Sequence, residues 1–293
     1  MKKVKKALLP AAGLGTRFLP VTKSVPKEML PIVAKPILLH LAEELVSAGI
    51  EELILVVPPK GKESLLDFFS SPSADLSDAL EASQRQDLLD SLEKVQASLK
   101  IRSVIQEKPM GLGHAVLTGK SAIGDEPFAV ILGDELSFAP AGTTPILKNL
   151  IEVYQETSLS TVAVMSVPSS EVNKYGIIQP QDENANPMRV LSVIEKPSIE
   201  KAPSRWALPG RYVFSSEIFE HLQNTDAGVG GEIQLSDAMS LLAETQGLMA
   251  LKNRCLRYDA GDKLGYIKAN IEYGLRDPEL GPKLKEYLSS LKL

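Results

Sequence analysis

Apolar residues gather in short runs that alternate with amphipathic stretches through the first half of the chain. The runs at 4–9 and 53–57 have the length of strands covered on both faces. Between them, Ile37, Leu41 and Leu45 share one face of a helix. A strand, a helix and a second strand in this order predict two parallel strands joined by a right-handed crossover.

The same alternation continues along the chain. Further strands are predicted at 101–105, 128–132 and 161–167, and helices near 113–120 and 145–156. The segment 62–100 differs, because its leucines recur at helical spacing without an intervening strand. We interpret this segment as a helical arm between two strands and not as a separate domain. The leucines concerned are Leu76, Leu80, Leu88, Leu92 and Leu99.

The second half of the chain has a different pattern. Residues 177–178 and 190–194 flank a polar loop that contains Pro and Asn, which is typical of a β-hairpin. One further strand is predicted over 206–214. Helices are then expected near residues 215–222, 233–244, 264–275 and 282–291.

These elements predict an α/β fold. We expect a Rossmann-like, mixed but mostly parallel central sheet flanked by helices, with a smaller β-rich part in the second half. The sequence shows no internal repeat, low-complexity tract or obvious linker. A single domain over 1–293 is therefore favoured over two small ones.

Composition excludes several classes of protein. The 293 residues are 44% hydrophobic and 24% charged, as in a globular protein, and the net charge of −5 argues against general binding of nucleic acid. No stretch approaches the roughly 20 apolar residues of a membrane span. Because Cys255 is the one cysteine, an internal disulfide is impossible, and a reducing, cytoplasmic location is expected. The basic N-terminus precedes only a short apolar run with a proline, so we expect no cleaved signal peptide.

A glycine-rich turn directly follows the first predicted strand. Gly13 and Gly15 let the backbone approach a ligand, and their N–H groups can line an anion site. Arg17, Lys23 and Lys27 add positive charge close by in the sequence. This combination of backbone donors and fixed cations is suited to phosphate. The third glycine of the dinucleotide-binding fingerprint and the P-loop pattern are both missing.

Polar residues at the ends of later strands suggest the rest of a site. Gln106 can donate and accept, so it can read the edge of a nucleobase, with Gly111 allowing close approach. Asp134 follows a buried strand, where a carboxylate can hold Mg²⁺ on phosphate oxygens. Its neighbour Glu135 is expected to point elsewhere and to be solvated.

Two further groups of residues are less informative alone. Glu195 can accept hydrogen bonds from sugar hydroxyls and Lys196 can pair with a phosphate, although an exposed Glu–Lys pair at a strand end is common. The three histidines lie in different predicted elements, which disfavours a zinc site. His114 is expected to make an ordinary hydrogen bond at a helix N-terminus.

The string P-A-A-G-L-G-T-R-F-L-P-x-T-K-x-x-P-K-E-M-L-P-I over residues 10–32 resembles the sugar nucleotidyltransferase family. Further blocks at 111–116, 195–197, 231–238 and 258–266 extend the resemblance over nearly the whole chain, although 62–87 match poorly. Ala-Ala before the first glycine resembles the uridylyl-transferring branch, since thymidylyl-transferring relatives usually have A-G-G there. Two departures, Ser236 for Thr and Ala260 for Cys, exchange small residues and cast little doubt on the reaction.

The resemblance implies transfer of a uridylyl group from UTP to glucose 1-phosphate, giving UDP-glucose and pyrophosphate with the help of Mg²⁺. A homo-oligomer, dimeric or tetrameric, is also expected. Alternatives remain: a sister transferase that uses dTTP or another sugar 1-phosphate, or an inactive paralogue that only binds nucleotide sugars. An NAD-dependent dehydrogenase is disfavoured by the missing third glycine.

The resemblance also assigns regions and residues. It implies a nucleotide-binding part at about 1–135, a sugar-binding part at about 170–262 and C-terminal helices at about 263–293. It implies catalytic roles for Arg17, Lys27 and Lys196. Nucleotide contacts fall on Ala11, Ala12, Gly13, Gly15, Thr16, Gln106 and Gly111. Sugar contacts fall on Gly176, Glu195 and Gly210, and Mg²⁺ falls on Asp134 with Asp259 as a second candidate. The block at 231–238 receives no chemical role beyond shaping the sugar pocket.

Overall fold

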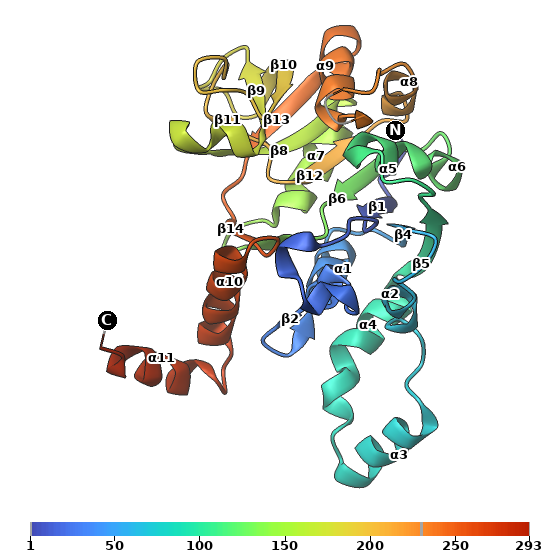
Figure 1. The fold of residues 1–293 in the computed structure, drawn as a ribbon, viewed down its shortest axis with the longest axis vertical. Helices are drawn as coiled ribbons and strands as arrows, with labels where there is room; N and C mark the ends of the chain where they lie inside the picture. The colour runs from blue at the N-terminus through green and yellow to red at the C-terminus, as the bar shows by residue number, and fades with distance from the viewer. Residues whose placement is uncertain (1, 229–230, 293) are drawn as a thin grey trace.

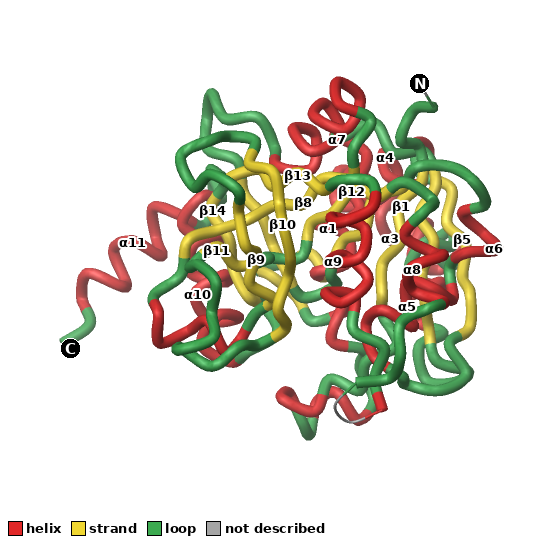
Figure 2. The backbone as a smooth tube through the Cα atoms, turned by 90° about the horizontal axis from the view of Figure 1, so that it is seen from above, coloured by secondary structure: helices red, strands yellow, loops and turns green. Residues whose placement is uncertain are grey.

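The computed structural model describes residues 2–228 and 231–292, so the two ends of the predicted domain, residues 1 and 293, lie outside the described residues. Within these ranges the main sheet has ten strands in the order β11-β9-β10-β13-β8-β12-β6-β1-β4-β5. Helices lie on both sides of this sheet (Figures 1 and 2). The predicted mixed α/β architecture is therefore confirmed.

The half of the sheet built from the first 135 residues is parallel. β1 (Lys6–Pro10) lies between β6 (Phe128–Ile131) and β4 (Glu52–Val57), and β4 pairs with the edge strand β5 (Lys100–Ile105). The predicted helix between the first two strands is α1 (Ile37–Ser47). Because all four strands run the same way, the loops after β1 and β6 meet at one edge, where ligands of open α/β sheets bind.

The two faces of this sheet belong to separate hydrophobic clusters. Along β1, Ala7 and Leu9 pack into one cluster with α1 and α7 (Ile146–Thr157), while Leu8 packs into the other with α9 (Leu235–Thr245). Alternate residues of a strand point to opposite faces, so a strand covered on both sides must be apolar at every position. The second cluster also includes α5 (Gly111–Thr118), α6 (Lys120–Ile123) and α8 (Ile218–Gln223).

The expectation of a mostly parallel sheet is wrong for the second half. β12 (Arg211–Phe214) is antiparallel to both of its neighbours, β6 and β8 (Ser160–Ser166). β9 (Gly176–Pro180) and β10 (Met188–Glu195) form the predicted hairpin, which is antiparallel by construction. A hairpin needs only a short turn, whereas a parallel pair needs a long crossover. β13 (Leu248–Lys252), which follows a helix, restores a parallel pairing with β8.

The strand predicted over 206–214 is two strands. β11 (Trp206–Ala207) pairs with β8 and β9, whereas β12 pairs on the far side of β8, beside β6. Residues 208–210 separate them, and Gly210 has φ near 90°, a left-handed conformation that a regular strand does not adopt. Two small sheets complete the β-structure: β7 (Glu135–Phe138) with β14 (Leu256–Asp259), and β2 (Pro31–Ile32) with β3 (Lys35–Pro36).

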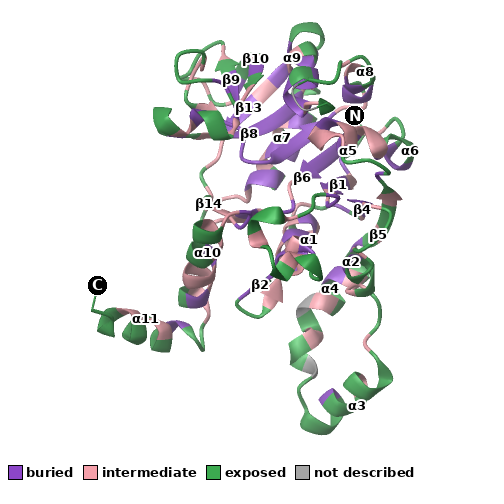
Figure 3. Cartoon of the chain, in the orientation of Figure 1, coloured by how far each residue is buried: buried purple, intermediate pink, exposed green. Residues whose placement is uncertain are grey.

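Two helical segments extend from the body of the molecule (Figures 1 and 3). One joins β4 to β5 and contains α2 (Ser64–Asp67), α3 (Ala74–Ser83) and α4 (Asp90–Ser98). The other follows β14 and contains α10 (Lys263–Arg276) and α11 (Gly281–Ser290). No helix within residues 2–228 and 231–292 combines the length and apolar character needed to cross a bilayer.

Candidate active site

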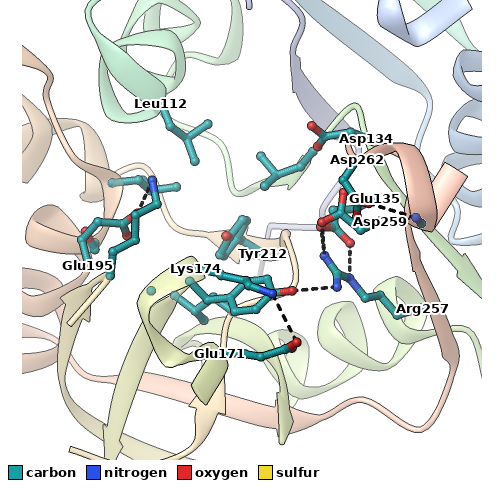
Figure 4. A pocket seen from close by; sticks show the side chains of 18 of the residues that line it. Leu112, Asp134, Glu135, Glu171, Lys174, Glu195, Tyr212, Arg257, Asp259 and Asp262 are labelled. Atoms are coloured by element: carbon teal, nitrogen blue, oxygen red, sulfur yellow. Dashed lines mark hydrogen bonds and ion pairs between the residues drawn. The ribbon is translucent and has the colours of Figure 1, made fainter. Parts of the chain in front are cut away.

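A cavity of about 900 Å³ opens at the ends of β6, β10 and β14 (Figure 4). Its carboxylates Asp134, Glu135 and Asp259 gather with Arg257 on one side, and Glu195 lies on the other. Its volume is in the range of ligand sites that hold a small molecule. Predicted residues that line it are Arg17, Asp134, Gly176, Glu195, Lys196 and Asp259.

Lys27 does not line the cavity itself but is paired with Asp134, which does. Its Nζ lies 2.6 Å from Asp134 Oδ2, and the two side chains are 20% and 18% exposed. Burial lowers the pKa of Lys27, but the charges of Asp134 and Glu28 outweigh it and the pKa is raised. For Asp134, burial raises the pKa, but Lys27 and Arg17 outweigh that effect and the pKa is lowered. Both groups are therefore held in their charged forms.

A buried ion pair supports the segment that carries Lys27. Lys27 lies in the 3₁₀ helix η3 (Lys27–Met29), whose Glu28 is fully buried and accepts a hydrogen bond from Lys62 Nζ at 2.8 Å. Burial lowers the pKa of Lys62, and Glu28 only partly opposes this. Because Lys62 lies just before α2, the pair connects the base of the arm to the cavity.

The glycine-rich turn curls around the same segment. Gly15 has φ near 65°, and a Cβ atom there would lie 3.2 Å from the Thr22 side chain and 3.6 Å from Lys27 Cβ. The Thr22 hydroxyl donates to Gly15 O at 2.8 Å, which holds the turn closed. At its start, Ala11 and Ala12 are buried at the end of β1. Gly13, Thr16 and Arg17 are exposed.

Gln106, the predicted base-reading residue, is buried and hydrogen-bonded to His114, for which an ordinary hydrogen bond was expected. Gln106 Nε2 lies 2.8 Å from His114 Nδ1 and 3.4 Å from Gly111 O. Both contacts use the amide nitrogen, so they do not occupy the amide oxygen. This assignment requires His114 Nδ1 to accept, with the ring proton on Nε2.

The block at 231–238 has a structural role that the sequence did not reveal. Ile233 N donates to Met110 O at 2.8 Å, and Gly113 N donates to Ile233 O at 2.9 Å. A Cβ atom at Gly113 would come 2.6 Å from Ile233 O, so glycine is needed for this approach. The contact places Gln234 and the start of α9 on the cavity wall.

Of the residues predicted to bind sugar, Gly176 and Glu195 lie together in the cavity wall, whereas Gly210 does not line the cavity. A Cβ atom at Gly176 would come 3.2 Å from both Glu195 Oε2 and Leu208 Cδ1, so glycine lets the Glu195 carboxylate lie close against the backbone here. Lys196 Nζ lies 3.4 Å from Glu195 Oε1, and Lys196 N donates to Tyr175 O at 3.0 Å. Gly210 packs on Leu132, a residue of the cavity wall.

The expectation that Glu135 is solvated is wrong. Glu135 is 8% exposed and accepts a bidentate hydrogen bond from Arg257, whose Nε lies 2.5 Å from Oε2 and whose Nη2 bonds Oε1. Burial raises the pKa of Glu135 even though Arg257 opposes it. Arg257 was not singled out from the sequence. Its position two residues before Asp259 on a strand puts both on one face, which could have indicated it.

The acidic side of the cavity fits Mg²⁺ held jointly with phosphates. Ala260 N donates to Asp134 O at 2.8 Å, which ties the segment bearing Asp259 to Asp134. Gly261 leaves the Asp134 carboxylate open, since a Cβ atom there would lie 2.6 Å from Oδ2. No group of three or more acidic, histidine or cysteine side chains among the described residues is arranged to hold a metal. One or two carboxylates completed by phosphate oxygens is the arrangement that Mg²⁺ commonly adopts.

Comparison with known proteins places the chain in a family. Residues 6–274 match the nucleotidyl transferase family model. A UTP–glucose-1-phosphate uridylyltransferase of Staphylococcus epidermidis is 44% identical, with 100% of both chains covered. Among solved structures, a UTP-bound UGPase from Acinetobacter baumannii has a TM-score of 0.90 at 38% identity, covering 99% of this chain and 100% of that one. A UDP-glucose pyrophosphorylase complexed with UDP-glucose has a TM-score of 0.86 at 39% identity, covering 94% and 100%. The chain therefore belongs to the nucleotidyl transferase family and groups with its UTP–glucose-1-phosphate uridylyltransferases.

Proposed function

We propose that this protein transfers a uridylyl group from UTP to glucose 1-phosphate, forming UDP-glucose and pyrophosphate. The observation that carries the proposal is that Arg17, Lys196 and Asp134 line one cavity, with Lys27 paired to Asp134. These residues are far apart in the sequence. A reaction between two polyanionic substrates needs such a convergence of cations.

In the proposed reaction, a phosphate oxygen of glucose 1-phosphate attacks the α-phosphorus of UTP, and the bond to the departing pyrophosphate breaks. The attacking oxygen is already anionic, so no general base is needed. The protein must hold two anions together and stabilise the charge that spreads in the transition state. Arg17 and Lys27 neutralise the leaving pyrophosphate, and Lys196 directs the phosphate of the sugar.

Asp134, with Asp259 as a second ligand, is the proposed holder of Mg²⁺. When bound, the ion supplies Lewis-acid stabilisation of the phosphate oxygens. In the structure Lys27 Nζ already lies against Asp134, so this carboxylate faces a cation even without the metal. Contact between Lys27 and the triphosphate would then require it to share or leave Asp134.

Substrate selection is assigned to two groups of residues. Beside the cavity but not lining it, the turn from Ala11 to Thr16 wraps the nucleotide, and Gln106 with Gly111 reads the base. Glu195, Gly176 and Gly210 surround the hexose. The amide oxygen of Gln106 can accept from the N3–H of uracil, but thymine presents the same group. Gln106 therefore favours uracil or thymine over cytosine, which has no N3–H, without separating UTP from dTTP.

The test is a substrate panel read by pyrophosphate release in Mg²⁺. It pairs UTP, dUTP and dTTP with glucose 1-phosphate, and UTP with galactose, mannose and N-acetylglucosamine 1-phosphates. We expect the highest kcat/KM for UTP with glucose 1-phosphate. Including dUTP separates the effect of the ribose 2′-hydroxyl from that of the thymine methyl group.

Two outcomes would contradict the proposal. Faster turnover of dTTP or of another sugar phosphate would make the protein a sister transferase. Binding of UDP-glucose by calorimetry without release of pyrophosphate would favour an inactive binding protein, a reading that the presence of all four charged residues disfavours.

A further inference from the structure

Arg257 connects the acidic side of the cavity to the sugar side. Beyond its bidentate bond to Glu135, its Nη1 donates to Tyr175 Oη at 3.1 Å, and its guanidinium lies 5.3 Å from the centre of the Tyr175 ring. Its Nη2 also lies 3.3 Å from Asp259 Oδ2. The side chain is 16% exposed, so these contacts are only weakly screened by water. Figure 4 shows Arg257 beside Glu135 and Asp259 at the cavity wall.

Three carboxylates, those of Asp134, Glu135 and Asp259, lie near Arg257. Without their partners in the protein, all three would be available to one metal ion. Asp134 and Glu135 are adjacent in sequence, and Glu135 is the register partner of Asp259 between β7 and β14. Asp134 is paired with Lys27, while Glu135 and Asp259 both face Arg257. The strongest geometry, the two-bond fork, is directed at Glu135 and leaves Asp259 with a single longer contact.

We propose that Arg257 is a positioning residue that withholds Glu135 from the metal site, so that only Asp134 and Asp259 remain for the cation. This inference rests on the proposed function for the metal, but it concerns which carboxylates the protein offers. Arg257 occupies the Glu135 carboxylate with a bidentate pair. Because Asp259 lies two residues further along the same strand, holding Arg257 in place also fixes the position of Asp259. Through its hydrogen bond to Tyr175, which directly precedes Gly176, Arg257 also sets the distance between the acidic side and the sugar side of the cavity.

The proposal gives an unusual expectation for metal binding. Removing Arg257 takes away a positive charge and frees the Glu135 carboxylate, so the protein without nucleotide should bind a divalent cation more tightly. Catalysis should nevertheless weaken, because a third carboxylate would occupy positions that phosphate oxygens need. A residue with only a structural role would weaken both metal binding and catalysis when removed.

The experiment measures Mn²⁺ binding by electron paramagnetic resonance, using the full chain without nucleotide. We expect Arg257→Gln to tighten the Kd for Mn²⁺ by about tenfold or more, since a unit charge a few ångströms away acts strongly at a partly buried site. In parallel, kcat for pyrophosphate release should fall and KM for glucose 1-phosphate should rise. Lys285→Gln, at an exposed position on α11 away from the cavity, is the matched loss of one positive charge and should change neither Kd nor kcat.

Two further variants isolate the role of Glu135. In Glu135→Gln/Arg257→Gln the competing carboxylate is gone, so the Kd for Mn²⁺ should return to within about threefold of the wild type. Arg257→Lys keeps the charge without the fork and should tighten Mn²⁺ binding less than Arg257→Gln does. Thermal unfolding midpoints show which variants are folded, and Arg257→Lys carries the test if Arg257→Gln is not.

Unchanged or weaker Mn²⁺ binding in folded Arg257→Gln or Arg257→Lys would overturn the proposal, as would tightening that persists in the double variant. These measurements need no turnover. If the wild type released no pyrophosphate but the Mn²⁺ series behaved as expected, the proposed reaction would fail while the role of Arg257 stood.

Discussion

Lys196 combines an exposed charge with a constrained backbone. Its side chain is 61% exposed, yet its φ of 44° is in the left-handed region that residues other than glycine rarely adopt. The bond from its N–H to Tyr175 O holds this conformation. Strain of this kind at a cavity is typical of a residue whose direction matters.

Lys196→Ala should lower turnover by at least about a hundredfold, on the scale of a lost electrostatic donor in a transition state. Steady-state pyrophosphate release measures the effect. Lys201→Ala removes a nearby exposed charge and serves as the control, with expected activity within about twofold of wild type. Near-normal turnover of Lys196→Ala would remove this lysine from the mechanism.

Protonation of Asp134 should be visible in stability. Its pKa in the folded protein lies below the ordinary value of 3.8, so the folded state binds fewer protons than the unfolded chain around and below that pH. The pair with Lys27 therefore stabilises the protein fully above the ordinary pKa, and this contribution is lost as the pH falls through the lower folded value. Urea unfolding between pH 3 and 7 should show the free-energy gap between wild type and Asp134→Asn shrinking below about pH 4. A gap that stays constant to pH 3 would mean that Asp134 is not held ionised.

The sequence singled out candidate residues in contiguous motifs more readily than residues whose partners come from distant elements. Arg17, Lys27 and Lys196 each lie in a short block with recognisable chemistry, and the resemblance reached all three. Arg257 has no motif of its own, because its partners come from β7 and from the loop before β9. Glu135 was misread for the same reason: alternation says which face a side chain takes but not which partner covers it.

The elements that the sequence predicted well are those with an uninterrupted apolar run or a clear helical spacing of apolar residues. The helix α1 and the buried strands β1, β4 and β6 follow the predicted ranges closely, since burial on two faces leaves a run of apolar residues. β13 was missed because five residues directly after a helix carry too little pattern. The direction of β12 depends on its two neighbours in the sheet, which no local pattern encodes.

The ion pair at the base of the arm gives a prediction for stability. Lys62→Met leaves Glu28 buried without a partner, which should cost about 3–5 kcal/mol of unfolding free energy, as for other broken buried pairs. Urea denaturation measures it. Lys60→Met, at an exposed position, is the control and should stay within about 0.5 kcal/mol.

The double variant Glu28→Gln/Lys62→Met tests the cause, since it removes the unpaired charge and should recover part of the loss. No recovery in the double variant would show that packing of Lys62, and not its charge, accounts for the effect. Either result bears on how firmly the arm is joined to the segment of Lys27.

For the whole molecule, the cavity is built from both halves of the chain, and none of its lining residues comes from the arm, whose α3 extends away from the body (Figure 3). Addition of UDP-glucose and Mg²⁺ should therefore slow hydrogen exchange in residues 171–176, 195–196 and 257–265. Exchange in 74–83, which forms α3, should not change. Equal protection of α3 would contradict this picture and would mean that ligand binding orders the arm as well.

The contact between Gly113 and Ile233 joins the segment after Gln106, the proposed base reader, to the start of α9 in the cavity wall. A larger side chain at residue 113, introduced to change the choice of base, would press on the carbonyl of Ile233. It would thereby displace the start of α9 in the cavity wall. Under the proposed function, a change in nucleotide preference at this contact should therefore also change sugar preference. A directed-evolution library aimed at a new nucleotide should randomise 233–236 together with 110–113, because a gain on one side alone would be offset by a loss on the other.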